Sequence, residues 1–434
     1  MPRTPLEQLA SLNVYRSKDE TRSNESATPR AEMTPQKPSN EVAFERLVSR
    51  LGPVLTDSAP LIENTSLSRD HLHKFWDWAQ RDLEPDTIAE LNETLGADNA
   101  PNERDIDNAV RDLVSTIAPL INGAQDDDEL KRRLTIQIGG HDVFETVEVL
   151  LMVLNYLPFI QSGYMLASEL NTAEDVETFS YALEHSQFPS DETKKFWCVG
   201  FVAGVAKIEL LANAIATHIF DKNDSSVRST GYGEYVDAFI IEAQKQIEVI
   251  ERQSGIFRDV DLICRAISRF HHVARCLQFN LDLPKSTLWV RQLEQLTSRA
   301  ASALNGRFGE VVSEVNKVLR PAQGTSRTSI DPNEVLQAYN GLYILAATRA
   351  ARESLALNAA VERAWREVGR ALEVMVDRIF EHYKLVVGGD PFAAAQVDVA
   401  IKFCSIRFGD DYAAVLKRNK LNIEQRAMRQ QVTH

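Results

Sequence analysis

From Glu41 onward, apolar residues return every three or four positions, the spacing that gathers them on one face of an α-helix. The longest such stripe comprises Leu357, Val361, Trp365, Val368, Leu372, Met375, Ile379 and Tyr383. By contrast, only one short run, Leu134–Ile138, has the β-branched composition of a strand, and one strand does not make a sheet. The pattern predicts an all-α protein, built as a multi-helix bundle or an α-solenoid-like helical array.

Several helix starts carry residues that cap a first turn. Asp331-Pro332 places a hydrogen-bond acceptor at the N-cap and proline at the first helical position, and Asp390-Pro391 repeats this device. Ser190 precedes two acids that suit the positive end of a helix dipole. We therefore expect helices to begin at these three points.

The chain of 434 residues is too long for one ordinary core. Residues 1–40 are rich in Ser, Thr, Pro, Lys and Glu and poor in large apolar residues, which predicts a disordered tail. The segment Arg320–Asn333 is rich in Gly, Pro and Ser, as expected of a domain boundary. We expect an N-terminal acidic helical region over residues 41–130, a central helical domain over 131–320 and a C-terminal helical region over 331–434.

The net charge of -14 disfavours a nucleic-acid surface, because such binding depends on cations facing phosphate. Residues 84–145 are the most acidic part, with 15 Asp and Glu against 5 Lys and Arg. Two apolar stretches, Val147–Ala167 and Phe196–Phe220, are each interrupted by polar or charged residues. They are better explained as buried helices than as membrane spans.

Features of cysteine usage and of the N-terminus bear on localisation. The four cysteines form no C-x-x-C pair and lie mostly in apolar helical surroundings, as in a reducing compartment. The first twenty residues lack the apolar core of a secretory signal. The sequence therefore predicts a cytoplasmic protein.

Common catalytic and metal-binding motifs are missing. The chain has no P-loop, no G-x-S-x-G nucleophile elbow, no H-E-x-x-H pair and no Glu-x-x-His. His141, Glu145 and Glu148 share a helical face with metal-ligand spacing, as do Asp70 and His73, but a solvated acidic face explains both groups better. We therefore predict no catalytic, cofactor-binding or metal-ligating residue, and no cofactor.

Gly200 and Gly204 form a face of small residues that lets two helix backbones approach closely. We expect this face to pack against the helices of Val147–Ala167. Those two apolar segments would then form the centre of the middle domain.

A basic row is the first candidate for partner binding. Arg258, Arg265, Arg269 and His272 recur at helical spacing beside the apolar stripe of Ile263, Ile267, Phe270 and Ala274. An exposed row would dock an acidic or phosphorylated protein, since Arg binds carboxylate and phosphate in bidentate fashion. The alternative is that the row pairs internally with acids of residues 84–145.

Trp78 is the second candidate. On a helix over residues 71–83 it lies about 200° from Trp76, so one of the two points away from the expected core face. An exposed tryptophan would anchor a partner. The alternative is that a larger bundle covers both.

These patterns favour a non-enzymatic helical interaction protein, a scaffold, adaptor or regulatory partner that binds other proteins through exposed helix faces. The rival hypothesis is a helical enzyme or small-ligand-binding protein whose site converges from several helices and leaves no local motif. A homo-oligomer is compatible with either.

Overall fold

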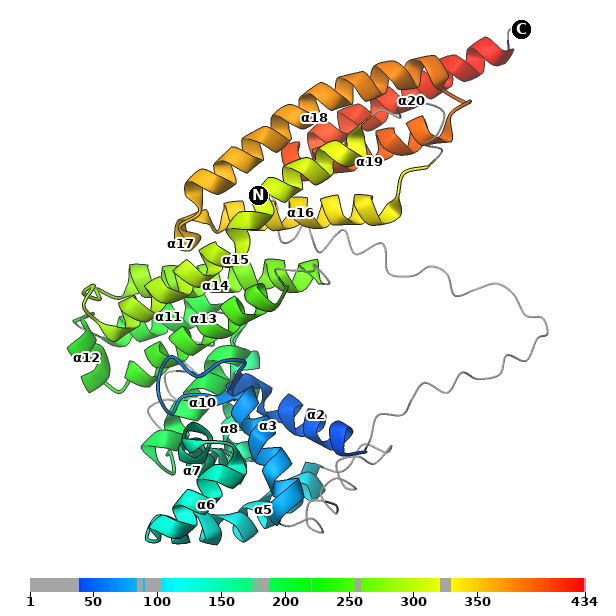
Figure 1. Ribbon diagram of the computed structural model, residues 1–434. Helices are drawn as coiled ribbons and strands as arrows, with labels where there is room; N and C mark the ends of the chain where they lie inside the picture. The colour runs from blue at the N-terminus through cyan, green and yellow to red at the C-terminus, as the bar shows by residue number, and fades with distance from the viewer. Residues whose placement is uncertain are drawn as a thin grey trace, which may run out of the picture.

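The computed structural model describes residues 39–83, 103–172, 187–219, 221–253, 259–320 and 329–432, together with residues 89, 175 and 179. The predicted tail of residues 1–40 lies outside this part of the chain, except that Ser39 and Asn40 begin the first described helix. Nearly all the described residues are helical, so the predicted all-α class is confirmed. Figure 1 shows the helices stacked in three groups along a long molecule.

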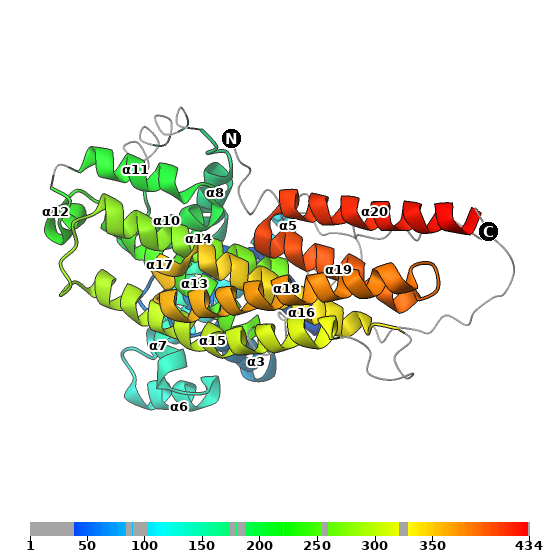
Figure 2. The same cartoon turned by 90° about the horizontal axis from the view of Figure 1, so that it is seen from above.

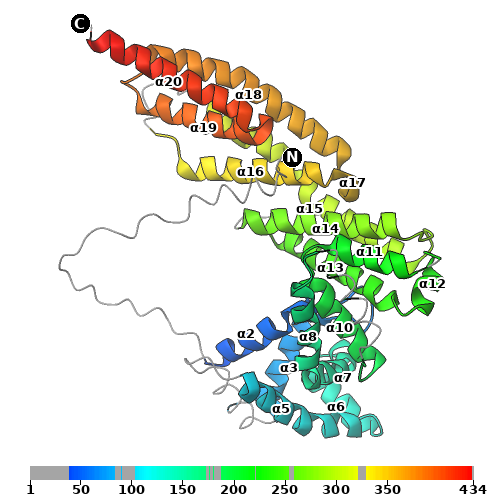
Figure 3. The same ribbon diagram turned by 180° about the vertical axis from the view of Figure 1, so that it is seen from behind.

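The N-terminal group forms one end of the array (Figure 3). It contains the two short strands. Its elements are α2 (Ser39–Leu51), η2 (Gly52–Val54), β1 (Leu55–Thr56), β2 (Leu67–Ser68), α3 (Arg69–Trp78), η3 (Ala79–Leu83), α5 (Glu103–Gly123), α6 (Asp128–Ile138), α7 (His141–Asn155) and α8 (Leu157–Ser168). The strands pair in parallel over two residues each and add almost nothing to an otherwise helical unit.

The middle group surrounds α13, which packs against α10, α14 and α15. Its helices are α10 (Asp191–Gly204), α11 (Ile208–His218), α12 (Asp224–Ser229), α13 (Gly233–Gln253), α14 (Val260–Asn280) and α15 (Leu288–Leu319). Because α15 also packs against α16 and α18, this long helix joins the middle group to the C-terminal one.

The C-terminal group is a bundle whose long helices run side by side (Figure 2). It contains α16 (Pro332–Ala350), α17 (Arg352–Leu355), α18 (Asn358–Val386), α19 (Pro391–Phe408) and α20 (Asp410–Val432). The stripe predicted from Leu357 to Tyr383 supplies the buried face of α18. Residues 321–328 of the predicted boundary lie outside the described residues, so the domain limits stay predictions.

The backbones of α8 and α10 approach each other closely, as the spacing of Gly200 and Gly204 predicted. A Cβ at Gly200 would lie 3.2 Å from the carbonyl oxygen of Ile160, and one at Gly204 would lie 2.5 Å from that of Tyr164. In the other direction, Gly163 leaves room for Trp197. The three missing side chains let the two backbones meet, as expected for a face of small residues.

The strand-like run Leu134–Ile138 proves to be the last turn and a half of α6, which corrects the sequence reading. Asp127 caps α6 by accepting the amides of Glu129 and Leu130, each at 3.0 Å, and Gly139 ends it in the left-handed conformation. Leu134 and Ile138 are buried one turn apart, whereas Ile136 is exposed. Caps at both ends outweigh the β-branched composition between them.

The predicted caps of α10, α16 and α19 are all confirmed. The side chains of Ser190, Asp331 and Asp390 each accept a hydrogen bond from a backbone amide in the first turn of the helix.

None of the described helices alone has the length and apolarity to cross a bilayer, although α7 and α8, bent by 67° at their junction, meet that test as a pair.

Candidate functional site

Arg269, in the middle of α14, is engaged inside the protein. Its Nε donates to Oε1 of the buried Glu242 at 2.8 Å, and its terminal nitrogens donate to the carbonyls of Val202 and Ala206. Val202 lies in the last turn of α10, where carbonyls lack helical partners and an arginine is favourable. Arg269 therefore holds together the break between α10 and α11.

His272 forms the next link between α14 and α11. Its Nδ1 lies against Oε1 of Glu209, in the first turn of α11, and both side chains are partly exposed. The hydrogen bond from His272 lowers the pKa of Glu209. A carboxylate thus already occupies this end of α11.

Arg265 lies one turn earlier on α14 and differs from both. Its side chain is exposed, and Nε donates only to the Asp261 carbonyl of its own helix, at 3.3 Å. It forms no ion pair with any described acid. Arg265 borders a hollow of about 420 Å³ lined by Ala206, Lys207, Ile208, Glu209, Arg265, Ser268, Arg269 and His272, which we call the α11–α14 hollow.

The structure thus divides the predicted basic row. Arg269 and His272 pair internally, but with Glu242 and Glu209 and not with the acids of residues 84–145. Arg265 remains available to a partner, and Arg258 lies outside the described residues.

Trp78 is placed differently from the exposed anchor considered above. Trp76 and Trp78 are only 3% and 1% exposed, and α3 packs against α6, α7 and β2. Trp78 is therefore not on the surface of the described chain.

The two metal-like groups found in the sequence are surface pairs. His141 meets Glu145 at 3.0 Å with both side chains mostly exposed, and Glu148 accepts from Gln125. His73 pairs with Asp77, and Asp70 with Lys74. Within the part of the chain that the structure describes, no three metal-ligating side chains gather in one place.

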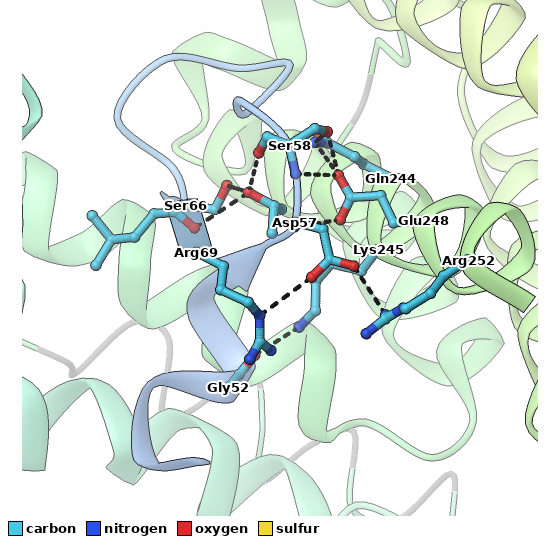
Figure 4. Close-up of polar contacts among 11 residues, drawn as sticks. Gly52, Asp57, Ser58, Ser66, Arg69, Gln244, Lys245, Glu248 and Arg252 are labelled. Carbon is cyan, nitrogen blue, oxygen red and sulfur yellow. Dashed lines mark hydrogen bonds and ion pairs between the residues drawn. The ribbon is translucent and has the colours of Figure 1, made fainter. Parts of the chain in front are cut away.

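Sequence reasoning missed a polar network between α13 and the loop that joins β1 to β2 (Figure 4). Glu248 is 6% exposed and accepts the amides of Asp57 and Ser58 at 2.7 and 3.1 Å, as well as the Ser58 hydroxyl. Gln244, fully buried one turn earlier, donates to the Ala59 carbonyl. These side chains satisfy the backbone of a loop that has no regular structure of its own.

Charged groups on both sides extend this network. Lys245 donates to the carbonyls of Gly52 and Pro53 at 3.3 and 2.9 Å, and burial lowers its pKa. Asp57 lies between Arg69 and Arg252, at 3.3 and 3.0 Å (Figure 4). The network fixes the loop on α13, so we assign it a positioning role.

One sequence signal pointed to buried polar groups on α13. The run AFIIEAQKQI, residues 238–247, is apolar on several sides of a helix, so polar residues within it have little surface to occupy. Glu242 and Gln244 within this run are indeed buried, as are Asp237 and Glu248 on either side of it. Comparison of the chain with protein-family models, with curated proteins and with solved structures found no match.

Proposed function

We propose that this chain is a cytoplasmic helical interaction protein that docks an acidic or phosphorylated segment of a partner protein in the α11–α14 hollow. The observation that carries the proposal is Arg265, an exposed guanidinium that borders the hollow and pairs with no described acid.

Other groups of the hollow suit the same ligand. Lys207, Ile208 and Glu209 at the start of α11 line the hollow, so the positive end of the helix dipole lies beside it. The Lys207 ammonium itself donates to the Asn171 carbonyl. Ser268 adds a hydroxyl on α14. Arg265 offers the bidentate geometry that phosphate and carboxylate prefer. Among the described residues, Glu209 is the one acid that lines the hollow, and His272 engages its carboxylate.

The cytoplasmic part of the proposal rests on the cysteines. Cys198, Cys264, Cys276 and Cys404 are all unpaired and buried. Unpaired thiols are typical of a reducing compartment.

The test is capture of peptides by the immobilised full chain. One randomised library carries a central phosphoserine, and a matched library carries serine at that position. We expect enrichment of phosphorylated and acid-rich peptides, weakened by added salt because the attraction is between exposed charges. Arg265→Glu should reduce recovery by about tenfold, the value of one charged hydrogen-bonding contact.

Arg366→Glu is the matched control. Arg366 is also exposed, and its Nε likewise donates to the carbonyl four residues earlier, that of Glu362, but it lies on α18 away from the hollow. This variant should capture peptides as the wild type does. Equal recovery of both libraries, or undiminished capture by Arg265→Glu, would refute the proposal.

A further inference from the structure

A second hollow, of about 500 Å³, lies where the β1–β2 loop meets the start of α13, and we call it the Asp237 hollow. Loop residues Leu61, Ile62 and Glu63 form one wall. The remaining lining residues are Lys195 of α10, Arg228 of α12, Gly233, Glu234 and Asp237 of α13, and Leu288 of α15.

Asp237 is the most unusual group in this hollow. Its residue is 7% exposed, and among the described contacts its carboxylate accepts one hydrogen bond, from Trp289 Nε1 at 2.6 Å. It forms no ion pair with a described cation, and burial raises its pKa. A carboxylate this buried is costly unless a positive group neutralises it.

The two cations of the hollow are differently engaged. Arg228 donates to Asp224 and lies over the ring of Trp289, 4.1 Å from its centroid. Lys195 is half-buried and has no hydrogen bond or ion pair among the described residues. Asp237 and Lys195 thus line the same hollow without pairing with each other.

We propose that the Asp237 hollow binds a free α-amino acid with an apolar side chain. The ligand ammonium pairs with Asp237 and its carboxylate with Lys195. Its side chain lies against Leu61, Ile62 and Leu288, which form the apolar wall.

The mixture of charges selects this class of ligand over simpler ions. Three carboxylates line the hollow, those of Glu63, Glu234 and Asp237, and Glu234 is paired with Lys194. A phosphate would meet these carboxylates, and a metal cation or a diamine would meet Lys195 and Arg228, so each would face repulsion. A zwitterion satisfies both signs at once. Pockets of this size commonly combine apolar walls with a few convergent polar groups.

The loop network of Figure 4 keeps the apolar wall in place. Gln244 accepts the amide of Leu61 at 2.9 Å, and Gln292 donates to its carbonyl at 2.9 Å. Gln244 also bonds to Glu248, which holds the loop at Asp57 and Ser58. The wall is therefore fixed before a ligand arrives, which lowers the entropic cost of binding.

The test is calorimetric titration of the full chain with L-leucine and L-phenylalanine. Three analogues of leucine separate the contacts: 3-methylbutylamine lacks the carboxylate, 4-methylpentanoate lacks the ammonium, and glycine lacks the side chain. We expect saturable binding of at least one of the two amino acids and affinity at least about tenfold weaker for every analogue, since each loses one contact.

Asp237→Asn and Lys195→Ala should each weaken binding at least about tenfold, because each removes one contact, and Asp411→Asn, a change at an exposed acid on α20, should leave it unchanged. Circular dichroism checks that the variants are folded. If Asp237→Asn does not fold, the affinity of Lys195→Ala tests the proposal. Absence of binding by both amino acids, equal binding of the analogues, or full affinity in a folded Lys195→Ala would overturn the proposal. Peptide capture at the α11–α14 hollow is measured without amino acids, so the two proposals fail independently.

Discussion

Trp289 donates its indole N–H to the carboxylate of Asp237 at 2.6 Å. Asp237 is buried, and this is the one hydrogen bond that its carboxylate accepts from the described residues. The indole ring is covered in turn by the guanidinium of Arg228. The pair therefore joins the start of α13 to the first turn of α15, while the Asp237 carboxylate forms no ion pair with a described residue.

The first prediction concerns the pH dependence of stability. Because burial raises the pKa of Asp237, the folded state binds its proton more tightly than the unfolded state. The ligand-free protein should therefore lose stability as pH rises from the ordinary Asp pKa, about 3.9, through the raised value. Asp237→Asn removes this loss and keeps an oxygen acceptor for Trp289.

We expect Asp237→Asn to exceed the wild type in free energy of unfolding at neutral pH, and to match it near pH 4. Urea unfolding at both pH values measures the difference. A variant less stable than the wild type at neutral pH would mean that the carboxylate is compensated in the folded state.

The second prediction tests the α8–α10 contact with two Gly→Ala variants. Gly204→Ala brings a Cβ against the Tyr164 carbonyl and should cost about 1–3 kcal/mol of unfolding free energy. Gly306→Ala, in the exposed interior of α15 with no atom within 4 Å of the added Cβ, should stabilise by up to about 1 kcal/mol. Thermal or urea unfolding reports both. The same sign for the two would contradict the described packing.

The third prediction concerns the loop network. Glu248→Ala leaves the amides of Asp57 and Ser58 without their acceptor and should cost about 1–3 kcal/mol. Amide hydrogen exchange in residues 57–63 should accelerate as the loop opens locally. The control is Glu381→Ala, which removes an exposed pair with Lys384 worth less than about 1 kcal/mol. Unchanged exchange in the loop would show that Glu248 does not hold it.

Local signals predicted much of the fold. Asp331, Asp390 and Ser190 carry their own capping chemistry, and the spacing of Gly200 and Gly204 alone indicated a close helix contact. In Leu134–Ile138 the same kind of reasoning failed, because the β-branched residues were weighed without the caps at Asp127 and Gly139. Local propensity is outweighed where both ends of a helix are fixed.

The candidate sites depended on long-range contacts that spacing does not encode. The row of Arg265, Arg269 and His272 was visible in the sequence. The sequence did not show that Arg269 and His272 pair inside the protein while Arg265 does not. That division depends on Glu209 and Glu242, which come from other helices. Likewise, Asp237 and Lys195 lie on different helices, and only folding places them in one hollow.

The division of the row also predicts the outcome of a second charge reversal. Arg269→Glu would place a carboxylate beside the buried Glu242 and release the carbonyls of Val202 and Ala206. We expect a loss of about 3–5 kcal/mol, as for other broken buried ion pairs. Arg265→Glu should stay within about 0.5 kcal/mol of the wild type, because the side chain is exposed. A comparable loss in both would show that Arg265 also serves the fold.

The docking proposal is tested most directly by hydrogen–deuterium exchange of the full chain with and without the phosphoserine peptide that it captures best. The predicted result is slower exchange in the first turn of α11 and in residues 265–272 of α14, present in the wild type and in Arg366→Glu but absent in Arg265→Glu. Slower exchange confined to other helices, or the same protection in Arg265→Glu, would contradict docking in the α11–α14 hollow.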